Sequence, residues 1–306
     1  MTLSNDDKLK KSATIAGILI SFVLILVKFF AFIKTDSLAV FSSLIDSATD
    51  LFSSLISFVA VYFSTKPISY THRYGYGKTE AISALMQAVF VGASGFFVFF
   101  DGINRLFNPI EILNAEAGVY IMLFSIFMTL LLVIFQLYVA KKTNSLAIKA
   151  DTAHYLVDFL TNSAVIISLT LTKIFDFVYF DIVAAIFISI YLLFNAYSLG
   201  KESLEQLTDS ELDDDIRANI EKIVLGCENV MGMHDLRTRN VANVYYIEFH
   251  LELDGGNSLF LTHKITELVE KNILQHYPSS QVLIHQDPYG IDESRLDNII
   301  KRSNEK

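Results

Sequence analysis

The sequence predicts an α-helical membrane protein with six transmembrane helices, plus a C-terminal α+β cytoplasmic domain. Three observations lead to this fold class. The 306 residues are 52% hydrophobic and only 19% charged, whereas soluble domains are usually about 25% charged. Long apolar stretches recur before residue 200, and acidic residues gather after it. This composition excludes disorder for most of the chain and argues against a soluble cytosolic enzyme. The single cysteine, Cys227, excludes an intrachain disulfide and a CxxC metal site.

Formal charge divides the chain in two. Residues 1–200 carry 13 Lys/Arg and 13 Asp/Glu, whereas residues 201–306 carry 11 and 20, so the second part holds the whole net charge of −9. Such a shift predicts a domain boundary near Gly200. We therefore expect an N-terminal cytoplasmic segment, a membrane domain, a cytoplasmic domain and a polar tail, over residues 1–12, 13–200, 201–290 and 291–306.

Apolar stretches of about 18 or more residues indicate membrane-spanning helices. Six such stretches precede Gly200, at Ala13–Ile33, Leu38–Ser64, Ala81–Asp101, Ala117–Ala140, Ala150–Thr172 and Asp181–Leu199. Basic residues concentrate on one side of them, because nine Lys/Arg fall in the N-terminal segment and in the loops after spans two and four. The opposite side holds three, Lys34, Arg105 and Lys173. The positive-inside rule then predicts a multi-pass protein of the cell (inner) membrane with both termini in the cytoplasm.

The acidic third of the chain has the pattern of a small α+β domain. Apolar and polar residues alternate cleanly over Val244–Leu253, as in a half-buried strand. The other segments have either helical periodicity or short apolar runs. The predicted order αββαβ consists of Glu211–Leu225, Val230–Thr238, Val244–Leu253, Leu261–His276 and Gln281–Gln286. Residues Asp292–Lys306 are polar, and we expect them to form a loose tail.

Two predicted spans carry pairs of metal-ligand side chains. Asp46 and Asp50 are four residues apart in span two, and His154 and Asp158 are four apart in span five, so each pair shares one helix face. A carboxylate at mid-bilayer costs at least about 2.5–3.5 kcal/mol. If the two helices face each other, three carboxylates and one imidazole surround one divalent cation. These ligands suit tetrahedral zinc, and they also admit Fe(II), Mn(II), Co(II) or Cd(II). The alternative is that they hydrogen-bond between helices as structural groups.

Histidines also cluster in the acidic domain. His234, His250, His263 and His285 lie near its predicted strand ends, and Asp287 follows His285 on the same side of a strand. This clustering predicts a second metal site, whereas a single surface histidine is usually only solvated. In the loop after span two, His72 has no second Cys, Asp or His close by, and it is a weak metal candidate in a glycine-containing connector.

Together these features resemble the cation diffusion facilitator family, in particular its bacterial exporters of zinc, iron and cadmium. The likeness extends from about Lys10 to Pro288 and includes the six spans, both ligand pairs, the Gly75–Glu80 loop and the terminal domain. It implies a six-helix membrane domain and a metallochaperone-like cytoplasmic domain that work as a homodimer.

The resemblance also implies a role for each site residue. Asp46, Asp50, His154 and Asp158 resemble the family's transport site, and Lys78 with Asp209 resembles a pair that locks the membrane domains together at the dimer interface. The residues similar to a binuclear cytoplasmic site that bridges the dimer are His234, His250, His263, His285 and Asp287. Related bacterial exporters hold a further site of one Asp and two His in the loop after span two. Here those positions are Ser69, His72 and Tyr76, so we expect that site to be missing or very weak.

The expected function is divalent metal efflux by metal–proton antiport, with zinc as the first candidate and ferrous iron or cadmium as alternatives. Metal and protons compete because the ligands must lose protons to bind metal. The protein would be a secondary active transporter and not an enzyme. Its expected partners are divalent cations, the lipid bilayer and a second copy of itself, with no nucleic acid.

Two other function classes fit the sequence less well. A metal-regulated membrane scaffold or sensor without transport would not need four ligands inside the bilayer, so these residues favour transport. An intramembrane metalloprotease would normally need an HExxH-like motif, which the sequence lacks. The sequence leaves open the physiological metal, the proton stoichiometry, and whether the cytoplasmic metal is regulatory or structural.

Overall fold

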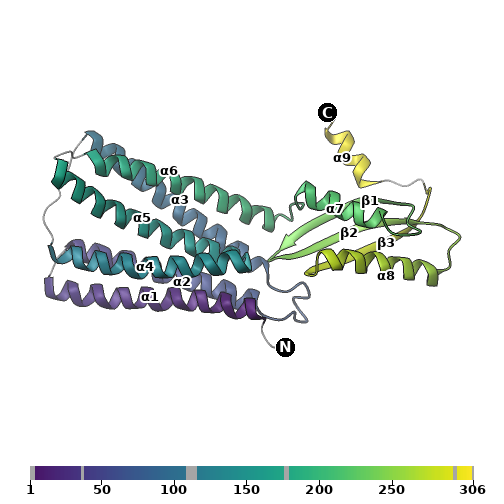
Figure 1. The fold of residues 1–306 in the computed structure, drawn as a ribbon, viewed down its shortest axis with the longest axis horizontal. Coiled ribbons are helices and arrows are strands. Elements are labelled where there is room, and N and C mark those ends of the chain that lie inside the picture. The colour runs from purple at the N-terminus through teal and green to yellow at the C-terminus, as the bar shows by residue number, and fades with distance from the viewer. Residues whose placement is uncertain (1–3, 36–37, 108–115, 176–178, 292–294, 305–306) are drawn as a thin grey trace. The chain divides into compact units, whose positions relative to one another are not determined.

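The structure, a computed structural model, describes residues 4–35, 38–107, 116–175, 179–291 and 295–304. The chain divides into two compact units, Met1–Leu204 and Glu205–Lys306 (Figure 1). The first unit is helical, and the second combines helices with a sheet. This is the α-helical membrane domain plus α+β domain that the sequence predicts.

The described residues of the first unit form six long helices, the last of which ends in the second unit. They are α1 (Asn5–Thr35), α2 (Leu38–Ser64), α3 (Lys78–Phe107), α4 (Glu116–Thr143), α5 (Leu146–Phe175) and α6 (Tyr179–Leu207). Helix α1 packs along α2 and α4, and α5 contacts α2, α3 and α4 (Figure 1). Helices α3 and α6 approach closely at Gly95, where an added Cβ would lie 3.0 Å from the Cβ of Leu192.

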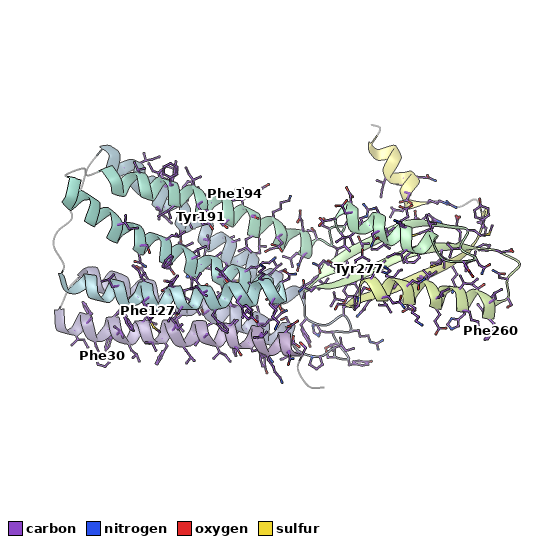
Figure 2. The ribbon with its side chains drawn as sticks, viewed as in Figure 1. Phe30, Phe127, Tyr191, Phe194, Phe260 and Tyr277 are labelled. Carbon is purple, nitrogen blue, oxygen red and sulfur yellow. The ribbon has the colours of Figure 1, made fainter. Side chains whose placement is uncertain are left out.

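Within the described residues, four helices are long and apolar enough to cross a membrane by length and composition. These stretches are Asn5–Ile33, Asp46–Ser64, Lys78–Asn104 and Leu123–Thr143. The predicted fifth and sixth spans lie within α5 and α6. Large aromatic side chains point away from the helices, among them Phe30, Phe127 and Phe194 (Figure 2). Buried positions are instead rich in Ala and Ser, as expected where membrane helices pack closely.

The second unit contains the predicted αββαβ order. Its elements are α7 (Asp214–Leu225), β1 (Gly232–Val241), β2 (Val244–Leu253), α8 (Leu259–His276), β3 (Ser280–Pro288) and a further helix α9 (Leu296–Asn304). The sheet order is β1-β2-β3, with β1 antiparallel and β3 parallel to β2. Alternate β2 residues Ile247, Phe249, Leu251 and Leu253 pack against α7 and α8 in one core. The opposite sheet face is left for polar side chains.

The C-terminal tail differs from the prediction, because residues 296–304 form α9 instead of a loose segment. Asp235 explains why this polar sequence becomes helical. Its two carboxylate oxygens accept hydrogen bonds from the backbone N–H of Leu296 and Asp297, at 2.8 and 3.0 Å. Asp297 in turn accepts from the N–H of Asp235 at 3.0 Å. These bonds satisfy N-terminal N–H groups that a helix cannot satisfy internally.

Candidate metal sites

The first candidate site lies between α2 and α5. Asp50, His154 and Asp158 each offer one ligand atom, and these atoms all lie within 4.8 Å of one another. His154 Nε2 is 3.1 Å from Asp50 Oδ1 and 3.9 Å from Asp158 Oδ2. Ligand atoms around a tetrahedral zinc ion lie about 3.4 Å apart, given bonds of about 2.0–2.1 Å. The donor set therefore fits a divalent metal with little rearrangement.

Asp46 is the predicted ligand that the structure leaves outside this group. Its side chain is exposed, although it interacts electrostatically with Asp50, one turn further along α2. An i, i+4 pair shares a face but does not bring two carboxylate groups to one point. The structure thus brings together three of the four predicted transport ligands.

A buried polar network surrounds Asp151, one turn before His154 on α5. Gln136 of α4 donates to Asp151 Oδ2 at 2.6 Å, and Ser54 of α2 donates to Asp151 Oδ1 at 3.4 Å. Ser54 Oγ also lies 2.7 Å from the hydroxyl oxygen of Tyr155, which lies 3.3 Å from the carbonyl oxygen of Gly17 on α1. Four helices are therefore tied together next to the candidate site.

A second buried network contains an ion pair. Lys10 Nζ of α1 lies 2.9 Å from Glu80 Oε1 at the start of α3, and Glu80 is only 1% exposed. Ser64 at the end of α2 donates to the same oxygen at 2.8 Å, and Ser145, just before α5, donates to the other. The network therefore joins α1, α2 and α3 to the residue that precedes α5.

The histidines of the second unit are aligned by strand register. His234 of β1 is paired with His250 of β2, which is paired with His285 of β3. The three imidazoles therefore form a row across the polar face of the sheet, with ring centroids 4.9 and 4.6 Å apart. Asp287 lies two residues after His285, so it points to the same face.

Asp287 links these histidines into the second candidate site. Its carboxylate lies 2.7 Å from His250 Nδ1, 3.2 Å from His285 Nε2 and 3.9 Å from His234 Nε2. Ligand atoms of His234, His250 and Asp287 all lie within 4.8 Å of one another. Imidazole and carboxylate donors at this spacing suit a borderline divalent ion such as zinc.

Burial divides the predicted ligands of the second unit into two kinds. His234 is 5% exposed, and its Nδ1 lies 3.3 Å from Glu252 Oε1. Glu252 is also buried and accepts a hydrogen bond from Arg295, next to α9. His285 is instead two-thirds exposed. The predicted ligand His263 lies on the exposed surface of α8, outside the group of three.

Three further predicted residues occupy other positions. His72 is exposed, bonds Thr71 Oγ1 through Nδ1 at 3.0 Å and stacks on Tyr76 at 4.3 Å between centroids. Lys78 begins α3 in the first unit. Asp209 belongs to the second unit, where its carboxylate lies 3.4 Å from Arg239 Nη1. The Lys78–Asp209 pair stays a prediction.

Several polar residues near the sites were not anticipated from the sequence, among them Lys28, Glu80, Asp151 and Glu252. For Lys28 and Asp151 the sequence held one usable signal, since charged residues inside apolar stretches usually face a protein interior. Glu252 could not be found in this way. Its closeness to His234 depends on the strand register, in which Gly232 is opposite Glu252.

The first unit has helices long and apolar enough to cross a membrane, and metal-ligand side chains meet between α2 and α5. With the histidine-lined sheet of the second unit, these features define a class, the metal-handling polytopic membrane proteins. Comparison with known families makes this more specific. Residues 14–208 match the cation efflux transmembrane domain, and residues 212–289 match the cytoplasmic domain of cation efflux proteins. The chain therefore belongs to the cation efflux, or cation diffusion facilitator, family, whose members are transporters and not enzymes.

The chain is also similar to individual known proteins. The chain is 38% identical over 293 residues to Protein p34 of Rickettsia rickettsii, an alignment that covers 96% of this chain and 97% of that protein. It is 36% identical over 284 residues to the cation-efflux pump FieF of Serratia proteamaculans, covering 93% and 94%. A solved structure, the metal-bound C-terminal domain of the CzcD transporter from Thermotoga maritima, is 31% identical. It covers 26% of this chain and 93% of that one, with a TM-score of 0.25.

Proposed function

We propose that this cation efflux protein exports zinc, with ferrous iron and cadmium as the alternative substrates, in exchange for protons. The observation that carries the proposal is the group formed by Asp50, His154 and Asp158 between α2 and α5. Its single imidazole nitrogen favours a borderline ion over a hard one such as Mg²⁺. Asp46 would complete the coordination when the metal binds.

Proton exchange follows from the chemistry of these ligands. Carboxylates and a neutral imidazole bind metal only after they lose protons, so a proton and a metal ion compete for each ligand. Metal would enter from the cytoplasm, and rocking of the helices would expose the site to the other side. Protons arriving there would displace the metal and reset the site. We place the protein in the inner membrane, with both termini cytoplasmic.

The second unit would bind metal as part of a homodimer. His234, His250 and Asp287, with His285 beside them, form the donor set, and bound cations would offset the negative charge of this acidic unit. Metal would then draw the two cytoplasmic domains together, with Lys78 and Asp209 joining the membrane domains at the dimer interface. Distance measurements between spin labels on the two domains, with and without zinc, test this role. An unchanged distance would favour a purely structural metal.

Transport is tested with purified protein in liposomes loaded with a zinc-sensitive dye, with and without a pH gradient. Asp50→Ala and Asp158→Ala should abolish zinc flux while the protein stays folded. Asp214→Ala removes an exposed carboxylate of α7 and is the matched control. Undiminished zinc flux in either ligand variant would overturn the site assignment. Zinc flux that is independent of the pH gradient would overturn proton exchange. Parallel measurements with Fe(II), Mn(II) and Cd(II) identify the preferred metal.

A further inference from the structure

A lysine lies inside the membrane domain beside the transport ligands. Lys28 belongs to the apolar stretch of α1 and is only 5% exposed. Its Nζ donates a hydrogen bond of 2.6 Å to Ser47 Oγ on α2. Ser47 is fully buried and directly follows Asp46 in the chain. The contact therefore anchors a cationic side chain next to the helix that supplies two of the carboxylates.

Lys28 lies within electrostatic range of the carboxylates of α2 and α5. Lys28 interacts electrostatically with Asp50, Asp46 and Asp158. An ammonium group has three donors and no acceptor, so it cannot itself bind a metal ion. Lysine in a membrane helix is costly and is usually retained for an ion pair or an ion pathway. Lys28 therefore affects the site through its charge.

Charge balance shows what this lysine can contribute. The three carboxylates carry three negative charges when ionised, and a divalent ion neutralises two of them. Lys28 neutralises the third, so the metal, these three carboxylates and Lys28 together carry no net charge. In surroundings of low dielectric constant an uncompensated charge is expensive. A neutral loaded site is easier to move through a conformational change than a charged one.

We propose that Lys28 sets the charge of the transport site. Its ammonium group matches the site to a divalent ion and weakens metal binding enough for release. This inference rests on the proposed transport function. The tethered ammonium repels the bound metal, so it raises the dissociation constant and speeds metal release. Ser47 holds the ammonium close enough to act without entering the coordination sphere.

The test compares variants that separate charge from hydrogen bonding. Lys28→Gln keeps a donor toward Ser47 but removes the charge, Lys28→Arg keeps the charge, and Ser47→Ala removes the hydrogen bond alone. Lys8→Gln changes an exposed lysine of the same helix and serves as the control. Zinc uptake kinetics in proteoliposomes give KM and kcat. Equilibrium zinc binding to the full-length protein, with His250 and Asp287 replaced by Ala, gives the affinity.

We expect Lys28→Gln to lower KM and the dissociation constant at least about tenfold, and to lower kcat as release slows. Lys28→Arg should lie closer to the unmodified protein than Lys28→Gln does. Unchanged or weaker zinc binding in Lys28→Gln would overturn the proposal, and so would an equal loss of folded protein in the Gln and Arg variants. If the unmodified protein transports no metal, the proposed function fails, but the binding measurement still tests the role of Lys28.

Discussion

The imidazole of His154 on α5 and the carboxylate of Asp50 on α2 meet at 3.1 Å, across a separation of 104 residues in the chain. Among Asp50, His154 and Asp158, only His154 offers a nitrogen donor. Replacing it with Asp makes the donor set all oxygen, which suits harder ions such as Mn²⁺. We expect His154→Asp to lower the preference for zinc over manganese at least about tenfold, measured as the ratio of flux efficiencies in proteoliposomes. A preserved ratio would show that His154 does not coordinate the metal.

The buried ion pair of Lys10 and Glu80 makes a prediction about stability. Removing one partner of a buried pair leaves an uncompensated charge and costs about 3–5 kcal/mol. Lys10→Met and Glu80→Gln should each destabilise the membrane domain strongly, as thermal unfolding in detergent would show. The double variant should recover much of the loss, because neither charge is then buried alone. Additive losses in the double variant would contradict direct pairing.

Close packing of α1 against the Asp151 network gives a second prediction about stability. A Cβ at Gly17 would lie 2.7 Å from Ser54 Oγ, which is shorter than van der Waals contact allows. Gly17→Ala should therefore destabilise the domain by about 1–3 kcal/mol. Adding Ser54→Ala removes the colliding oxygen and should rescue part of the loss in the same unfolding measurement. If Ser54→Ala restores none of the lost stability, the strain lies elsewhere in the helix packing.

The candidate sites could be predicted from the sequence where ligands share an element, and less well where they come from different elements. The spacing of Asp46 and Asp50 places them on one helix face. It cannot show that Asp50 lies near His154 while Asp46 does not. Strand alternation likewise places His250 on the polar face of β2. It does not give the cross-strand register that aligns His250 with His234 and His285.

The membrane spans and the αββαβ order are easier to predict than the helical tail. Apolar length, helical periodicity and strand alternation are local properties, and they indicate the membrane spans and the αββαβ order directly. Helix α9 has a weak local signal, because its polar sequence becomes ordered through the distant residue Asp235. A sequence pattern cannot show such a tertiary cap.

The geometry of the second candidate site predicts that its histidines contribute unequally to metal binding. His250 lies 2.7 Å from Asp287, whereas His263 is on the exposed surface of α8. In full-length protein with Asp50 and Asp158 replaced by Asn, His250→Ala should weaken zinc binding by about 100-fold or more, by calorimetry. His263→Ala should have a smaller effect. Equal losses would show that His263 reaches the metal through a rearrangement or from a second copy of the chain.

Docking of α9 should depend on pH through Asp235. Burial by itself would raise the pKa of this carboxyl group, but hydrogen bonds from the backbone N–H of Leu296 and Asp297, with His234 and His250 nearby, lower the pKa below its ordinary value. A lowered pKa means that the ionised form favours the docked state. The stabilisation is thus complete above the ordinary Asp pKa of about 3.9 and is lost as the pH falls through the lower folded value.

Hydrogen exchange of residues 296–304 in metal-free, full-length protein measures this docking. The protected fraction should stay constant from neutral pH down to about 4 and then fall, after correction for the intrinsic exchange rate. Asp235→Ala should expose the segment at neutral pH, because loss of a helix cap costs about 1 kcal/mol or more. Asp215→Ala removes an exposed carboxylate of α7 and should leave protection unchanged. Full protection in Asp235→Ala would show that α9 is held by its other contacts, chiefly the pair of Arg295 and Glu252.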